Sequence, residues 1–192
     1  MKITVQVGLL FAAIWIVIKM ILFYTDSFGN NIVPSGMINI LCVLLAISVG
    51  MYKFKRAQIH ATSFLTDIKS GMTAGVPYTL IVSVFMFLFY SKIDPDFISH
   101  KVSDITYEMK QRVDDPVKLK RLREDNEDFE VMSKEQIYDR MTQGPLIFAS
   151  AKFTMVITLL ALLLLSTLNS IFVAIIYRKV VFKDAHANLL DE

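Results

Sequence analysis

The sequence predicts an all-α integral membrane protein with four transmembrane helices and a small helical extracytoplasmic insert between the third and the fourth. Hydrophobic residues make up 54% of the 192 residues, and the mean hydropathy of +0.50 is far above that of an ordinary soluble protein. The hydrophobic residues are also grouped into long runs that polar segments separate. We therefore expect residues 1–192 to form a single membrane domain.

Four runs are long enough to cross a hydrocarbon core of about 30 Å at roughly 1.5 Å per residue. They cover residues 5–24, 34–52, 71–90 and 153–177. The first run is too long for a cleaved signal peptide, and no small-x-small cleavage site follows it before Asp26, so we expect it to remain as a signal anchor. Each run ends on a tyrosine, which is typical of an aromatic belt at the membrane surface: Tyr24, Tyr52, Tyr90 and Tyr177.

The distribution of Lys and Arg predicts the orientation. The segments expected on the same side of the membrane as the N-terminus are rich in Lys and Arg. In the loop between the first two runs, by contrast, the only charged residue is Asp26. Between Lys92 and Arg140, acidic residues outnumber basic ones by 13 to 10. We therefore expect both termini to be cytoplasmic and the segment 91–152 to be extracytoplasmic.

Two stripes of small residues predict how the third and fourth runs pack. In each stripe the residues recur at multiples of four, so they lie on one face of a helix and allow a second helix to approach closely. Interhelical hydrogen bonds between such stripes contribute about 0.6 kcal/mol each. The third run carries Gly71, Gly75, Thr79 and Ser83, and the fourth carries Thr154, Thr158, Ser166 and Ser170.

Pro77 interrupts the third run. It has no N–H to donate to the carbonyl of Thr73, and it favours a kink. Two interpretations follow, a static bend and a gating hinge.

The connection between the second and third runs has apolar residues at spacings of three and four. This pattern predicts an amphipathic interfacial helix within residues 53–70. Its basic residues, Lys53, Lys55 and Arg56, would then face anionic headgroups.

Two lysines fall close to the expected outer boundary of the membrane. Lys19 lies five residues before Tyr24, and Lys152 directly precedes the fourth run. A charge at mid-bilayer costs about 2.5–3.5 kcal/mol on insertion scales. Each lysine therefore either extends its amine outward to the interface or forms a buried functional or structural ion pair within the membrane.

The insert between the third and fourth runs reads as three helices. The first covers about residues 97–113, Asp115 caps the second, and Ser133 with Gln136 forms a capping box for the third. Gly144 and Pro145 then mark the entry to the last run. A basic run at 118–123 precedes an acidic run at 124–130, and we interpret both as solvated charge.

The sequence contains no pattern typical of a known catalytic or cofactor site. The four runs contain no Asp, Glu or His, and the single cysteine, Cys42, lies inside the second run. The acidic run lacks the spacing of a calcium-binding EF-hand loop. The expected extracytoplasmic location of the basic run, and the acidic run beside it, argue against nucleic-acid binding. We expect no enzymatic activity, no cofactor and no metal site.

The third run and its flanks resemble the domain of unknown function 4199 family, small bacterial membrane proteins common in Bacteroidota. The order of the spans and the insert is also similar. The resemblance implies an integral inner-membrane protein and supplies no activity. It rests on Asp67, Lys69, Gly71, Gly75, Tyr78, Phe85, Phe89 and Tyr90, and on the segment Ile93-Asp94-Pro95-Asp96-Phe97.

Small-residue helix faces and amphipathic outer helices favour a non-catalytic accessory or interaction subunit of a membrane complex. Its partners would be the lipid bilayer and either another membrane protein or further copies of the chain. The alternative is a small oligomeric channel or transporter, with Lys19 and Lys152 near its outer mouth.

Overall fold

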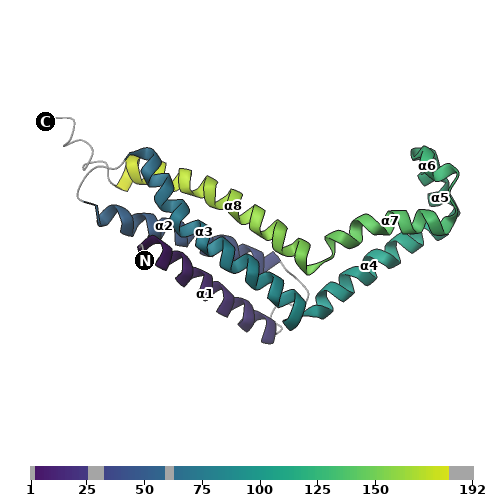
Figure 1. Cartoon of the computed structure of the whole chain (residues 1–192), viewed down its shortest axis with the longest axis horizontal. Coiled ribbons are helices and arrows are strands. Elements are labelled where there is room, and N and C mark those ends of the chain that lie inside the picture. Colours follow the sequence, from purple (N-terminus) through teal and green to yellow (C-terminus); the bar gives the residue numbers. More distant parts are fainter. Residues whose placement is uncertain (1–2, 26–32, 59–62, 182–192) are drawn as a thin grey trace. The chain divides into compact units, whose positions relative to one another are not determined.

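The structure is a computed structural model that describes residues 3–25, 33–58 and 63–181, and every element in this part of the chain is helical (Figure 1). Two of the helices, α3 and α8, continue directly into a π-helical turn, η1 and η2. The elements are α1 (Ile3–Tyr24), α2 (Val33–Arg56), α3 (Phe64–Leu88), η1 (Phe89–Ile93), α4 (Pro95–Asp114), α5 (Pro116–Asp125), α6 (Glu127–Glu130), α7 (Lys134–Phe148), α8 (Ala151–Ile176) and η2 (Tyr177–Val181).

Four helical segments are long and apolar enough to cross a membrane, so the chain is a multi-pass membrane protein. They are Ile3–Tyr24, Val33–Arg56, Phe64–Ile93 and Ala151–Val180. Each contains one of the four predicted runs completely and extends beyond it at one or both ends. The polar connection that follows Thr25, and His60, lie outside the described residues.

The chain forms two compact units. The first, here called the membrane unit, comprises Met1–Phe85 and Ile157–Glu192. The second, here called the insert unit, comprises Met86–Val156 and thus includes the whole of the predicted insert at 91–152.

Glycines allow the helices of the membrane unit to touch. A Cβ added to Gly8 of α1 would overlap the carbonyl oxygen of Ala74 in α3 and lie 3.1 Å from its carbonyl carbon. A Cβ added to Gly50 of α2 would lie 2.8 Å from the Cβ of the same alanine. Backbone contact of this kind is typical of small residues in membrane helix interfaces. Ala74 is therefore one point at which α1, α2 and α3 meet.

The structure differs from the expected interfacial helix between the second and third spans. Lys53 and Arg56 belong to the last turn of α2, whereas the segment from Phe64 onward already belongs to α3. Most of the apolar residues that produced the amphipathic pattern therefore belong to α2 or α3 and not to a separate helix. The expectation that Lys55 faces the headgroups was also wrong, because its side chain is only 6% exposed.

Each helix of the insert unit begins at a polar cap. The carboxylate of Asp94 accepts from the N–H of Phe97 at 3.2 Å, and that of Asp115 accepts from the N–H of Val117 at 2.9 Å. Proline follows each of these caps, as is common in a first helical turn. Asp115 therefore caps a second helix, as the sequence predicts.

A small core holds the insert unit together. Val113 of α4, Leu119 of α5 and Ile137 of α7 are buried against one another. Partly buried side chains complete the cluster: Phe129, Met132, Tyr138 and Met141. These apolar residues keep α4, α5 and α7 together while their charged faces remain exposed.

The break before the last membrane helix lies later than expected. Pro145 does not separate the insert from the last span, because it lies inside α7, which continues to Phe148. The chain turns at Ala149 and Ser150 instead, and the hydroxyl of Ser150 accepts from the N–H of Phe153. A serine cap thus starts α8, and the proline interrupts a helix without ending it.

We expect Ser133→Ala to destabilise the insert unit by about 1 kcal/mol, because Ser133 and Gln136 form a complete capping box at the start of α7. The same helix start lowers the pKa of Glu135, first through its own backbone N–H and then through the Ser133 hydroxyl. Hydrogen exchange of the first amides of α7 should become faster in the variant. Ser99→Ala, an exposed change inside α4, is the control and should leave exchange in α7 unchanged. Unchanged exchange in Ser133→Ala would contradict the cap.

Candidate functional site

The candidate site is built around a buried carboxylate in the first turn of α3. Ser63 starts this helix, since its hydroxyl accepts from the N–H of Thr66 at 3.2 Å. Asp67 follows directly and is 0% exposed. A negative charge near a helix N-terminus is favoured by the helix dipole, but burial of a charge requires partners of opposite sign.

Two cations from other elements meet this carboxylate. The ammonium group of Lys55 in α2 lies 3.0 Å from Oδ2 of Asp67. The Nε of Arg178 in η2 donates to the same oxygen at 2.7 Å. The arginine side chain is 25% exposed, so it enters the cluster from the edge of the bundle. Asp67, Lys55 and Arg178, here called the ion cluster, thus tie three elements together.

Aromatic residues reinforce the attachment of η2. The guanidinium carbon of Arg178 lies 5.7 Å from the centre of the Phe64 ring, within the range of a cation–π interaction. The hydroxyl of Tyr177 donates to the carbonyl of Ser48 at 2.9 Å, and its ring packs edge-on against Tyr52. The end of α8 is therefore bound to both α2 and α3.

The ion cluster stands at one end of a closely packed seam between α3 and α8. A Cβ added to Gly71 would lie 2.7 Å from the hydroxyl oxygen of Ser170, and one added to Gly75 would lie 2.9 Å from the Cβ of Ser166. The hydroxyls of Thr79 and Ser166 are 3.4 Å apart. These five residues of the two predicted stripes therefore lie together at this seam.

The remaining stripe residues make local bonds or are partly exposed. The hydroxyl of Ser83 donates to the carbonyl of Thr79 in its own helix at 2.8 Å. Thr154 likewise donates to the carbonyl of Ser150 at 3.0 Å, and Thr158 is half-buried.

A second polar contact lies further along α3. The hydroxyl of Tyr78 donates to Oδ1 of Asn39 in α2 at 2.6 Å, and both residues are buried. The indole of Trp15 in α1 donates to the carbonyl of Ser35 at 3.4 Å. These bonds link α1, α2 and α3 at some distance along the helix from the ion cluster.

The two lysines singled out in the sequence belong to different units. Lys19 is half-buried in α1 of the membrane unit, whereas Lys152 is exposed in the first turn of α8, within the insert unit. Neither lysine belongs to the ion cluster described above.

The chemistry of the ion cluster suits fixing helices in place. The carboxylate oxygen Oδ2 of Asp67 already contacts two cations, which hold it as a charged acceptor. Within residues 3–25, 33–58 and 63–181, no group of three or more His, Cys, Asp or Glu side chains is placed to hold a metal ion.

Asp67 was not among the residues that the sequence singled out as functional, yet two signals point to it. It is the only acidic residue between Asp26 and Asp94, a stretch that contains several Lys and Arg residues. It also lies four residues before Gly71 and so extends the stripe of small residues by one helical turn. A lone acid on the buried face of a membrane helix requires a cation, and the basic residues at the end of α2, Lys53, Lys55 and Arg56, are candidates.

The family model described as "Protein of unknown function (DUF4199)" matches residues 6–179. The match includes the three residues of the ion cluster and the whole insert unit. Comparisons of the chain with curated proteins and solved structures found no match.

Proposed function

The chain belongs to the DUF4199 family of proteins of unknown function, and we propose that it is a non-catalytic accessory or interaction subunit of a membrane protein complex. In this proposal the membrane unit anchors the chain in a bacterial inner membrane. The insert unit contacts the partner.

The observation that carries the proposal is the construction of the insert unit. Its small core of Val113, Leu119 and Ile137 fixes helices whose other faces are strongly charged. Apolar side chains are exposed among these charges, including Tyr107 at 66% and Val131 at 90%. A fixed surface that mixes charged groups with exposed aromatic and aliphatic groups is typical of protein–protein contact sites.

The packing of the membrane unit supports an anchoring role. Glycine contacts bring α1, α2 and α8 against α3 so closely that an added methyl group would overlap its neighbours. The ion cluster fixes the end of α8. The alternative, a small oligomeric channel or transporter with Lys19 and Lys152 near its outer mouth, would need a path for a solute between copies, because the helices within one chain pack closely.

The proposed orientation places the ion cluster on the cytoplasmic side. Exposed basic residues surround this end of the membrane unit, as the positive-inside rule describes: Lys53, Arg56, Lys69 and Lys179. The termini are then cytoplasmic and the insert unit is extracytoplasmic, where it meets the partner's extracytoplasmic surface.

Site-specific photo-crosslinking in native membranes tests the proposal. A photoreactive residue at Val131 or Tyr107 should yield a discrete protein adduct, because these positions lie on the proposed contact surface. The control is Leu164 in the middle of α8, which is 67% exposed and should yield lipid adducts. If both insert positions yield only the single chain and lipid products, the proposed function is wrong.

A further inference from the structure

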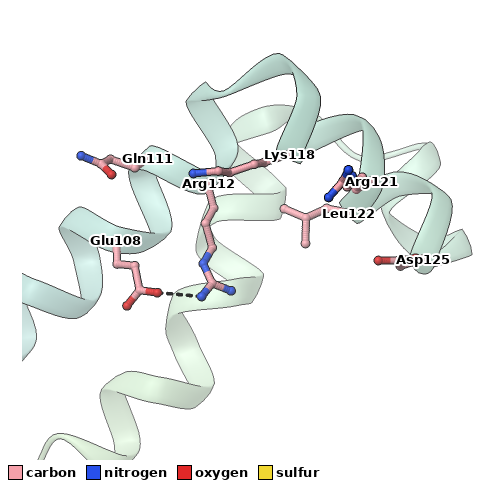
Figure 2. Close-up of a pocket in the computed structure, with 7 residues that line it drawn as sticks. All are labelled: Glu108, Gln111, Arg112, Lys118, Arg121, Leu122 and Asp125. Atoms are coloured by element: carbon pink, nitrogen blue, oxygen red, sulfur yellow. Dashed lines mark hydrogen bonds and ion pairs between the residues drawn. The ribbon is translucent and has the colours of Figure 1, made fainter.

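A groove opens on the insert unit between α4 and α5 (Figure 2). Its volume is about 380 Å³, enough for several side chains of a partner. Three of its lining side chains are cationic, two are acidic, and Leu122 supplies an apolar wall. The lining consists of Glu108, Gln111, Arg112, Lys118, Arg121, Leu122 and Asp125.

The cations of this groove remain accessible. Arg112 donates to Glu108 at 2.6 Å, yet its side chain is 47% exposed. Lys118 lies 3.8 Å from Asp115 and is 55% exposed, and Arg121 is exposed as well. Exposed ion pairs of this kind contribute little to folding stability. The cations can therefore leave their present carboxylate partners and bind the carboxylates of another chain at little cost in free energy.

An acidic segment begins at the end of α5, where Asp125 lines the groove, and continues through α6. Five of the seven residues from 124 to 130 are Asp or Glu. The structure holds this segment in place, because Asn126 caps α6 and the guanidinium of Arg123 donates to the carbonyl of Met132 at 3.1 Å. The carboxylates of α6 are exposed: Glu127, Asp128 and Glu130.

A groove with three cationic and two acidic side chains lies beside an acidic segment on the same compact unit, and the excess cations of the one complement the carboxylates of the other. If two copies are related by a two-fold axis that passes between these features, the groove of each copy faces the acidic segment of the other. Both copies sit in the same membrane, so their insert units lie on the same side of it and at a high effective concentration. Charge complementarity of this kind steers association and fixes its register.

We propose that the groove between α4 and α5 binds the acidic segment 124–130 of a second copy of the chain, and that the two copies do so reciprocally. Lys118 and Arg121 contact the carboxylates of Glu127 and Asp128 in the other copy. The inference rests on the proposed role as an interaction subunit and names the first partner as the chain itself.

Two charge-reversal variants of the full chain test the reciprocal arrangement. The first is Lys118→Glu with Arg121→Glu, and the second is Glu127→Lys with Asp128→Lys. In each variant alone like charges meet at both contacts, so we expect self-association in lipid nanodiscs or mild detergent to weaken at least tenfold. In a mixture of the two variants, opposite charges meet at both contacts. We expect a heterodimer of nearly wild-type affinity.

A matched control reverses two lysines on the α4 helix outside the groove lining, Lys101→Glu with Lys110→Glu, and should leave self-association unchanged. Circular dichroism confirms that each variant is folded. Recovery in the mixture excludes misfolding as the cause of the loss. Higher salt should weaken the wild-type dimer, because the contacts are exposed.

Three results would overturn the inference: a wild-type chain that does not self-associate, reversal variants that associate as tightly as the wild type, or folded variants whose mixture does not recover. A crosslink from Val131 to another membrane protein, together with any of these results, would leave the proposed function intact. Absence of every crosslink from the insert unit would remove both proposals.

Discussion

Asp67→Asn should lower the free energy of unfolding of the membrane unit by about 3–5 kcal/mol, because it leaves two cations in the bundle without their shared carboxylate. The ammonium group of Lys55 is affected most, since its side chain is only 6% exposed. Thermal unfolding of the purified protein in detergent measures the loss. The end of α8 should also become more accessible to protease, because Arg178 loses its ion pair with Asp67 of α3.

The control for Asp67→Asn is Asp96→Asn, which neutralises an exposed carboxylate in the first turn of α4 and should change stability by less than about 1 kcal/mol. A rescue variant separates lost charge balance from lost packing. Changing Lys55 and Arg178 to Met in the Asp67→Asn background removes the stranded cations and should recover most of the stability. If Asp67→Asn is as stable as the wild type, the ion cluster does not hold the bundle.

Gly8→Leu should separate α1 from α3 and destabilise the membrane unit by roughly 1–3 kcal/mol or more. Even a single Cβ at this position would overlap the carbonyl oxygen of Ala74, and a backbone carbonyl has no rotamer by which to move aside. Gly8→Ala should show a smaller loss in the same direction. The transition midpoint in a mixed-micelle denaturation assay measures both.

Gly36→Ala is the matched control, because it also places a methyl group on a helical glycine of a membrane span. A Cβ there would meet no described atom within 4 Å. Alanine is favoured over glycine inside a helix by up to about 1 kcal/mol, so this variant should be as stable as the wild type or more stable. Equal losses in Gly8→Ala and Gly36→Ala would contradict the close contact at Ala74.

Long apolar runs are strong local signals, and the four spans were therefore evident from the sequence. The caps at Asp115 and Ser133 were equally evident, since a cap is formed by residues within three or four positions of each other. Pro145 shows that a helix end cannot always be predicted from nearby residues alone, because it lies inside α7. Its position suggested a helix end, but the turn at Ser150 supplied the cap that starts α8.

The ion cluster could not be deduced in full, because it joins residues that are far apart in the chain. Arg178 is 111 positions from Asp67. Lys55 belongs to a basic segment that, on charge alone, resembles a headgroup-facing surface. Only the packing of α2, α3 and η2 turns that lysine inward. The one sign of the ion cluster in the local sequence was Asp67, a lone acid on the stripe of small residues.

The groove of the insert unit, like the ion cluster, is formed by residues of different helices and could not be deduced from the sequence. The basic and acidic runs are visible in the sequence, where solvation accounts for both. The two runs are adjacent in the chain, but the groove also needs α4, which the core of Val113, Leu119 and Ile137 joins to α5 and α7. The folded unit therefore shows a groove where the sequence alone shows a charged loop.

Native mass spectrometry of the wild-type protein, released with its surrounding lipid directly from native membranes, tests the central claim of an interaction subunit most directly. We expect assemblies heavier than the 21.9 kDa chain, containing a second copy, another membrane protein or both. A single species of 21.9 kDa carrying only lipid would contradict the account.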